Sequence, residues 1–192
     1  MPGQKLEEIL ESAILLFREK GYHATSMQDL ADAVGLQKGS LYHHISSKED
    51  LLLKIIDRAV RSLIARVESI LNEPISPWEK LEKAIANHVE VVTSNLGPLT
   101  IFMRESYAVT AEQRGEIRRT RRRYRELFEE ILREGVRQGE FRPMDIRLVS
   151  LAMFGLGGSI YQWYQPHGRL SPAEISREFS DLLLRGILVG GA

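Results

Sequence analysis

Residues 36–44, LQKGSLYHH, combine two apolar side chains with a run of hydrogen-bonding ones. An α-helix that lies in the major groove of DNA needs this combination, because its outer face must be polar and its inner face must reach a core. Leu36 and Leu41 can supply the inner face. The polar side chains are those of Gln37, Lys38, Ser40, Tyr42, His43 and His44. The segment therefore predicts a recognition helix that binds double-stranded DNA.

The charges around this segment favour the same function. The chain carries 26 Lys and Arg and 26 Asp and Glu, so its formal net charge is zero and it has no global field to attract nucleic acid. Residues 1–50 contain eight acids against five lysines and arginines, yet no acid lies between Ala33 and Lys48. The recognition segment is a locally basic island in an acidic region.

Two short helices must position this segment, and the sequence marks both. Thr25 predicts the cap of the first helix, with Gln28 as its reciprocal partner, and Gly35 predicts the end of that helix. The second helix is expected over about residues 38–44. Two helices joined by a tight, glycine-containing turn form a helix-turn-helix.

The rest of the chain also predicts helices, and we expect an all-α fold with about nine of them. A first helix over about residues 4–20 ends at Gly21, and Ser46 or Ser47 opens a long helix to about Leu71. Serine, proline and acid start signals at 76–79 and 171–174 open two more helices. Gly97 and Pro98 predict a break before a short helix at 99–107. Further long helices are expected over about 111–138 and 145–165.

Residues 148–166 contain no charged side chain, a length that approaches that of a membrane span. Three glycines and polar residues such as Ser150, Ser159 and Gln162 would make insertion unfavourable, so we expect a buried or subunit-facing helix. Acids precede the first apolar run, so no signal peptide is expected. With no cysteine in the chain, we expect a cytoplasmic protein.

Catalytic signatures do not accompany these helices. The sequence has no G-x-S-x-G elbow, H-E-x-x-H pair, phosphate-binding glycine loop or recognisable pair of acids, so an enzyme is not expected. His43 and His44 would point about 100° apart on a helix and cannot share a metal. We expect neither a metal nor a cofactor. A helical adaptor protein is a rival, but it would not need an acid-free, polar recognition helix.

Residues 16–52, LFREKGYHATSMQDLADAVGLQKGSLYHHISSKEDLL, resemble the N-terminal domain of the TetR family. They carry its glycine after the first helix, its Thr-Ser pair, its A-x-x-x-G turn and its G-S-L-Y-x-H and S-K-E-x-L motifs. Ile45 is a conservative departure from the phenylalanine of many relatives. The resemblance implies a homodimeric repressor of a palindromic operator, with residues 1–47 as the DNA-binding domain and 48–192 as the effector-binding and dimerisation domain.

The resemblance also implies roles for individual residues in DNA binding. Base edges or the DNA backbone would be contacted by Gln37, Lys38, Ser40 and His43. Phosphates would be held by Thr25, Ser26, Tyr42, His44 and Lys48. Tyr42 could instead pack on the helical bundle, and Lys48 could be solvated. Gly39 is either a turn residue or gives clearance for a close backbone approach.

The C-terminal half carries an Arg-rich helix, G-x-F-R-P, an uncharged W-Y helix and P-x-G-R-L-S-P-x-E-I. It resembles TetR-family members that respond to acyl-CoA thioesters. The implied effector is an acyl-CoA or aryl-CoA thioester that releases the operator; a regulator of multidrug efflux that senses hydrophobic or cationic drugs is the alternative. Seven arginines lie within residues 114–125, and they either pair with acids at 126–134 or hold ligand phosphates.

An effector pocket is expected between the helices of this half. Each candidate could also belong to the ordinary core. The candidates are His88, Val92, Phe102, Met103, Tyr107, Arg118, Arg122, Phe128, Phe154, Tyr161, Trp163 and Tyr164. The dimer contact is expected on the last two long helices, where Gly155, Gly157 and Gly158 would permit close helix approach or shape a cavity.

Overall fold

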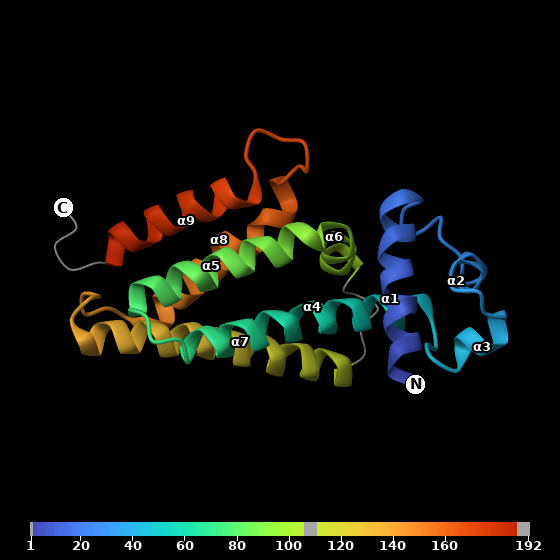
Figure 1. Ribbon diagram of the computed structural model, residues 1–192, viewed down its shortest axis with the longest axis horizontal. Helices are drawn as coiled ribbons and strands as arrows, with labels where there is room; N and C mark the ends of the chain where they lie inside the picture. Colours follow the sequence, from blue (N-terminus) through green and yellow to red (C-terminus); the bar gives the residue numbers. More distant parts are fainter. Residues whose placement is uncertain (1, 106–110, 188–192) are drawn as a thin grey trace. The chain divides into compact units, whose positions relative to one another are not determined.

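The computed structural model describes residues 2–105 and 111–187, with side chains for 4–100, 115, 117–183 and 185–187. The described residues form an all-α fold of nine helices, as expected (Figure 1). The helices are α1 (Pro2–Glu19), α2 (Met27–Ala33), α3 (Lys38–Tyr42), α4 (Lys48–Leu71), α5 (Pro77–Ser94), α6 (Leu96–Glu105), α7 (Ala111–Gln138), α8 (Ile146–Trp163) and α9 (Pro172–Ile187).

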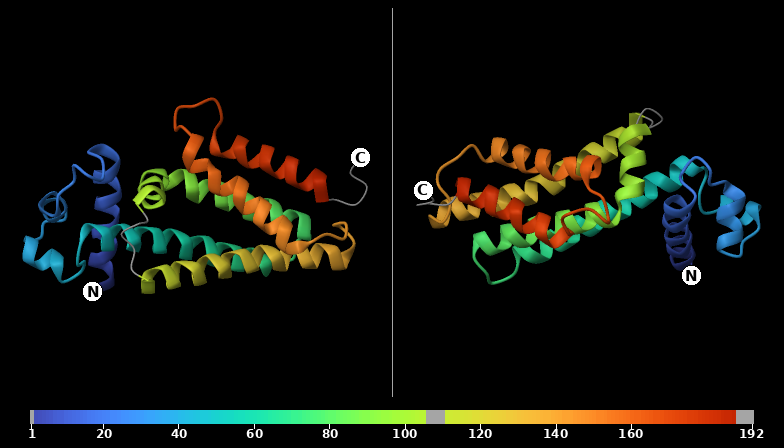
Figure 2. Two further views of the ribbon diagram at one scale, coloured as in Figure 1. Left: turned by 180° about the vertical axis from the view of Figure 1, so that it is seen from behind. Right: turned by 90° about the horizontal axis from the view of Figure 1, so that it is seen from above.

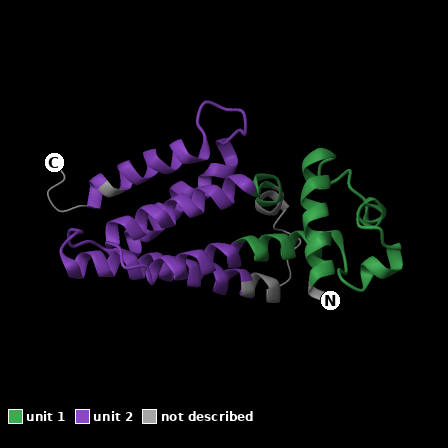
Figure 3. Ribbon diagram, viewed as in Figure 1, with its two compact units in different colours: residues 1–59, 95–110 green, residues 60–94, 111–192 purple. Residues whose placement is uncertain are grey.

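The chain divides into two compact units (Figure 3). Unit 1 comprises residues 1–59 and 95–110, and unit 2 comprises 60–94 and 111–192. Helix α4 is continuous from Lys48 to Leu71 and contributes residues to both units. The boundary expected between residues 47 and 48 separates a DNA-binding domain from an effector-binding and dimerisation domain. The two compact units do not test this assignment of functions, so it stays a prediction.

Helix starts follow serine-acid pairs. At α5, the Ser76 hydroxyl accepts from the Glu79 N–H at 3.2 Å, and the Glu79 carboxylate accepts from the Ser76 N–H at 2.9 Å. Ser171 and Glu174 make the same exchange at α9. These reciprocal bonds satisfy donors that the first turn leaves without helical partners. Both start signals predicted from the sequence are therefore confirmed.

The predicted cap of α2 is wrong by one residue. Ser26, and not Thr25, is the N-cap, and Asp29 rather than Gln28 is its partner: the Ser26 hydroxyl accepts from the Asp29 N–H at 3.1 Å, and the Asp29 carboxylate accepts from the Ser26 N–H at 2.8 Å. The Gln28 amide instead donates to Asp32. The shorter Asp side chain reaches back to the cap nitrogen as well as Glu does in the other two helices.

The break predicted at Gly97 and Pro98 is also misplaced. Both residues lie in the first turn of α6, which begins at Leu96. Proline is tolerated there because the first-turn N–H groups have no helical acceptor. The chain therefore breaks between Ser94 and Leu96 rather than after Pro98.

Helix α5 is at the centre of unit 2 and contacts α7, α8 and α9 (Figure 2). Its stripe of buried residues includes Leu81, Ile85 and Val89. Leu127 and Ile131 of α7 are fully buried as well. None of the described helices is apolar enough over sufficient length to cross a membrane. Helix α8, in which Arg147 is the one charged residue, contacts α5 and α7 within unit 2.

A glycine-containing turn caps the C-terminal end of α7. Gly139 adopts a φ of 78°, which L-residues with a side chain rarely adopt. The N–H of Glu140 then donates to the Gly135 carbonyl at 3.0 Å, and the N–H of Gly139 donates to the Val136 carbonyl at 3.2 Å. This is the Schellman arrangement, and it brings the buried Phe141 ring onto Gly135.

Candidate nucleic-acid interface and ligand cavity

Helices α2 and α3 form the helix-turn-helix predicted from the sequence. Gly35 lies between them with a φ of 65°, and its N–H donates to the Asp32 carbonyl at 3.2 Å. The Leu36 N–H donates to the Ala31 carbonyl at 2.9 Å. These bonds end α2 and redirect the chain within two residues, so α3 can start at Lys38.

Helix α3 has one apolar anchor and a polar outer face. Leu41 is completely buried, while Leu36 is half-buried. Exposed side chains are those of Gln37, Lys38, Tyr42 and His43; Ser40 and His44 are half-buried. Tyr42 is 46% exposed and therefore does not pack into the bundle, which removes the alternative considered for it.

Gly39 needs no special backbone conformation. It lies inside α3 and has no positive φ, and a Cβ built on it would meet no atom within 4 Å. It is thus not a turn residue, contrary to one of the two interpretations. None of the residues with described side chains requires glycine here, and clearance for a close backbone approach stays a prediction.

Thr25 and Ser26, both expected to bind phosphate, are engaged within unit 1. Thr25 is 1% exposed, and its hydroxyl donates to the Gly21 carbonyl at 2.8 Å. The Ser26 hydroxyl lies 2.6 Å from the Asp29 carboxylate. The Lys20 ammonium, together with the Ser26 hydroxyl and N–H, holds the pKa of Asp29 well below its usual range. A charged carboxylate therefore occupies the N-terminus of α2, and phosphate binding there stays a prediction.

Lys48 ties the start of α4 to the turn before α2. Its ammonium donates to the carbonyls of Tyr22, His23 and Thr25 at 2.7, 3.4 and 3.0 Å and lies 4.5 Å from the centroid of the Tyr22 ring. The side chain is therefore not merely solvated. The phosphate contact expected for Lys48 would have to be shared with these carbonyls, and it stays a prediction.

Unit 2 contains a small cavity of about 20 Å³, room for about one water molecule. It is lined by residues of helices α5, α7, α8 and α9 and is partly open to solvent. The lining residues are Ile85, His88, Val89, Phe128, Met153, Phe154, Gly157, Phe179 and Leu183. An effector that is buried between these helices would have to displace side chains of the lining.

Three predicted effector residues line this cavity: His88, Phe128 and Phe154. Val92 is buried on α5 but does not line it, and Trp163 is 45% exposed near Phe179. Tyr161 accepts from the Gln162 amide, and Tyr164 caps the end of α8. The side chains of Phe102 and Met103, and the whole of Tyr107, lie outside the described residues. Five further lining residues were not predicted from the sequence, because their apolar side chains resemble ordinary core residues: Ile85, Val89, Met153, Phe179 and Leu183.

His88 is the polar side chain of the cavity lining. Its Nδ1 lies 3.2 Å from the hydroxyl oxygen of Tyr124, and the two rings are stacked with centroids 5.9 Å apart. Burial lowers the pKa of His88 to about 4, although the nearby Gly157 backbone acts in the opposite direction. Burial also raises the pKa of Tyr124 far above its usual value. Both groups are therefore neutral at physiological pH.

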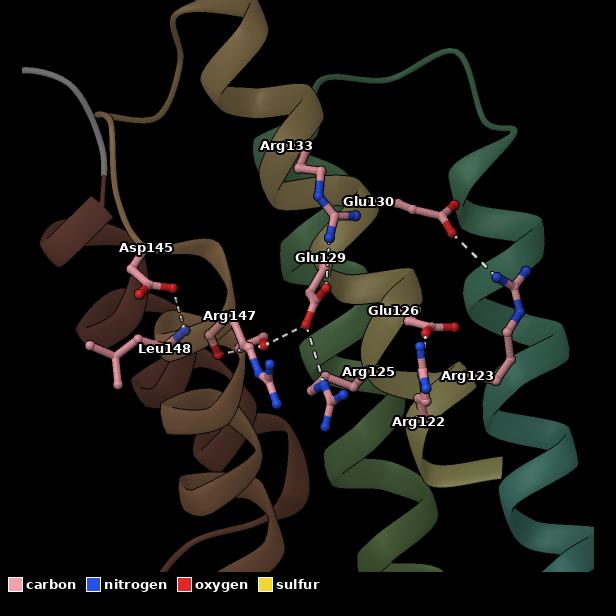
Figure 4. Close-up of polar contacts among 11 residues, drawn as sticks. Arg122, Arg123, Arg125, Glu126, Glu129, Glu130, Arg133, Asp145, Arg147 and Leu148 are labelled. Atoms are coloured by element: carbon pink, nitrogen blue, oxygen red, sulfur yellow. Dashed lines mark hydrogen bonds and ion pairs between the residues drawn. The ribbon is translucent and has the colours of Figure 1, made fainter. Parts of the chain in front are cut away.

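The arginines of α7 form ion pairs with acids (Figure 4). Arg122 contacts Glu126 at 2.8 Å, and Arg125 contacts Glu129 at 3.3 Å. Arg123 bridges Glu130 and, on α4, Glu68. Of the two interpretations of the arginine cluster, pairing with acids therefore holds for these three arginines. Arg118 is exposed.

Glu129 is the buried member of this network. It accepts from Arg125, from Arg133 at 2.7 Å and from the buried Ser150 of α8 at 3.3 Å. A buried carboxylate requires such partners, because an unpaired one would cost several kcal/mol. The network joins α7 to α8 beside the cavity.

Comparison with known proteins gives matches over most of the chain. Residues 9–65 match the family described as bacterial regulatory proteins, tetR family, and residues 74–187 match the tetracyclin repressor-like C-terminal domain. The chain is 30% identical over 188 residues to the transcriptional repressor KstR2 of Mycolicibacterium smegmatis, which covers 97% of this chain and 92% of that protein.

Two solved structures resemble the fold. A TetR/AcrR-family regulator from Thermobifida fusca has a TM-score of 0.84 and 34% identity, covering 95% of this chain and 98% of that one. AibR in complex with isovaleryl coenzyme A and operator DNA has a TM-score of 0.75 and 30% identity, covering 94% and 98%.

Proposed function

Because the chain belongs to the TetR family of bacterial transcriptional regulators, we propose that it represses transcription as a cytoplasmic homodimer on a palindromic operator and is released by an acyl-CoA or aryl-CoA thioester. It is a regulator and not an enzyme. The observation that carries the effector class is the likeness to AibR, whose structure holds isovaleryl coenzyme A and operator DNA.

The DNA-binding part of the proposal is supported by α3. Its outer face presents the exposed Gln37, Lys38, Tyr42 and His43, and Gly39 leaves room beside them. Hydrogen bonds to base edges discriminate sequences, whereas phosphate contacts strengthen binding to all of them. We assign base readout to Gln37 and Lys38 and a phosphate contact to Tyr42.

Tyr42→Phe is expected to weaken binding to every operator variant by about tenfold, because only a hydroxyl-phosphate hydrogen bond is lost. Lys38→Ala is expected to change the preferred bases instead. Selection from a library with randomised half-sites, followed by fluorescence anisotropy, measures both effects. A uniform loss for Lys38→Ala, or a changed preference for Tyr42→Phe, would contradict the assignment.

The dimer part is supported by apolar residues that α8 and α9 leave exposed. Leu148 and Leu151 of α8 are 64% and 47% exposed, and Leu182 of α9 is 63% exposed. The opposite face of α8 is buried through Ser150, Met153, Gly157 and Ile160. A second copy of the chain would cover these leucines, and two recognition helices would then reach successive major grooves.

The effector part rests on the cavity and on the arginines of α7. The acyl chain would enlarge the cavity between Phe128 and Phe154, while the nucleotide phosphates would meet arginines of α7. At 100° per residue, Arg122 lies roughly 160° around α7 from Tyr124, and Arg118 roughly 120°. Arg121 lies roughly 60° from Tyr124, and we therefore add it to Arg118 as a phosphate candidate. Arg122 would have to exchange its ion pair with Glu126 for a phosphate to act in the same way.

Operator release by a panel of CoA thioesters tests this effector class. We expect at least one short or branched thioester to release the operator fragment in a gel-shift assay, and free coenzyme A to leave it bound, because binding must favour a conformation that no longer fits DNA. Release by cationic dyes but by no thioester would favour the regulator of multidrug efflux. The adaptor alternative would give no sequence-selective band.

A further inference from the structure

His88 has one ring nitrogen without a partner. Its Nε2 is buried and makes no hydrogen bond of ordinary geometry with the described residues, although a polar contact of the ring with the Gly157 backbone acts to raise the pKa of His88. A buried donor or acceptor without a partner costs about 1–3 kcal/mol. Most such groups in folded proteins are satisfied, so an exception calls for an explanation. Nε2 belongs to a ring that lines the cavity.

The contact with Tyr124 indicates which nitrogen carries the proton. If the Tyr124 hydroxyl donates to Nδ1, 3.2 Å away, the phenol is satisfied and the proton of the neutral ring is on Nε2. If Nδ1 donated instead, the phenolic O–H and Nε2 would both lack partners, at about twice the cost. Tyr124 thus orients His88 with an N–H group at Nε2.

Gly157 makes this arrangement possible. A Cβ at this position would lie 2.5 Å from Nε2 and from Cδ2 of His88, closer than two such atoms can pack. The residue is buried on α8, and no positive φ requires glycine there. Glycine therefore lets the His88 ring, with Nε2 at its leading edge, approach the backbone of α8.

We infer that the His88 Nε2–H group donates a hydrogen bond to the carbonyl oxygen of an acyl ligand, which Tyr124 orients it to do. The inference rests on the proposed effector function and names the residue that recognises the acyl group. The remaining lining is apolar, including Phe128, Phe154 and Phe179, and suits a hydrocarbon chain. A hydrocarbon alone would leave Nε2 without a partner.

The test compares ligands that differ only in the carbonyl. Isothermal titration calorimetry of the full chain is carried out with isovaleryl-CoA and with S-isopentyl-CoA, the thioether that has CH₂ in place of C=O. Wild type should prefer the thioester by about tenfold, the value of one hydrogen bond. His88→Phe should reduce this preference to less than twofold. The exposed His167→Phe is the matched control and should keep the preference.

Two further measurements separate this inference from the proposed function. In imidazole ¹⁵N NMR of the ligand-free protein, His88 should be protonated at Nε2, and 4-methyl-2-pentanone, but not 2-methylpentane, should shift that signal. This result with no binding of either CoA compound would reject the CoA effector and support the inference. Equal binding of thioester and thioether by wild type would retain the effector and overturn the inference. Protonation at Nδ1, or no shift with the ketone, would overturn it as well.

His88→Phe could also perturb packing, and Tyr124→Phe guards against this. It retains the ring that stacks on His88 and removes only the hydroxyl that fixes the tautomer. We expect the preference for the thioester to fall about threefold in this variant. An unchanged preference would contradict the role of Tyr124.

Discussion

The double substitution Leu148→Glu with Leu182→Glu is expected to lower operator affinity at least about a hundredfold. Both leucines are more than 60% exposed in the single chain, so the substitutions do not disturb its core. In the proposed dimer they would place charges in an apolar interface, where unpaired charges are strongly unfavourable. A monomer would bind one half-site and lose the gain from linking two sites, which is about 10²–10⁴ in affinity.

Sedimentation velocity and fluorescence anisotropy measure the two effects. The double variant should sediment as a monomer with unchanged helical circular dichroism. Ala173→Glu with Gln165→Glu is the control, because it adds the same charge at exposed positions and Ala173 lies roughly 180° around α9 from Leu182. A double leucine variant that stays dimeric would show that the interface lies elsewhere.

Gly135→Ala is expected to destabilise unit 2 by about 2–3 kcal/mol, in the range of overpacking in a dense core. A Cβ at Gly135 would lie 2.1–2.7 Å from three atoms of the Phe141 ring. That ring is 1% exposed and cannot swing into solvent without losing its own burial. The backbone hydrogen bonds of the Schellman turn at Gly139 hold Phe141 close to Gly135, so the backbone cannot move away to relieve the clash.

Urea unfolding followed by circular dichroism measures the loss. Gly115→Ala is the matched control on the same helix, because its new Cβ would meet only the Arg119 guanidinium at 3.8 Å, an ordinary contact. Alanine favours helix over glycine, so this control should gain up to about 1 kcal/mol. Equal stabilities of the two variants would mean that Phe141 does not pack on Gly135 in solution.

Most helices could be predicted from the sequence because their starts are encoded locally. Ser76 and Ser171 each precede a proline and an acid, and one turn of chain is enough to form the cap. Near α2 the signals overlap, since Thr25 precedes Gln28 by three residues just as Ser26 precedes Asp29. The Thr25 hydroxyl bonds the Gly21 carbonyl, a contact that no local pattern reveals.

The two candidate sites also differ in how far local sequence determines them. The outer face of α3 follows from the position of Leu41, which is fully buried, so the exposed side of this helix could be predicted from the sequence. The DNA contacts of its side chains stay predictions. The cavity depends on how four helices meet. His88, Phe128 and Phe154 were predicted from their side-chain types, but Phe179 and Leu183 read as ordinary core residues of α9. Ion pairing of Arg123 with Glu68 depends on tertiary packing in the same way.

The contacts of the Lys48 ammonium couple helix α4 mechanically to the turn that precedes α2. Helix α4 is one uninterrupted rod from Lys48 to Leu71, and its first residue is tethered to the turn at 22–25 by three carbonyls and the Tyr22 ring. Any axial shift of the rod must carry this turn with it or break charge-assisted bonds and a cation–π contact. This turn leads directly into Ser26, the N-cap of α2. A displacement of α4 along its axis would therefore be transmitted to the start of the helix-turn-helix.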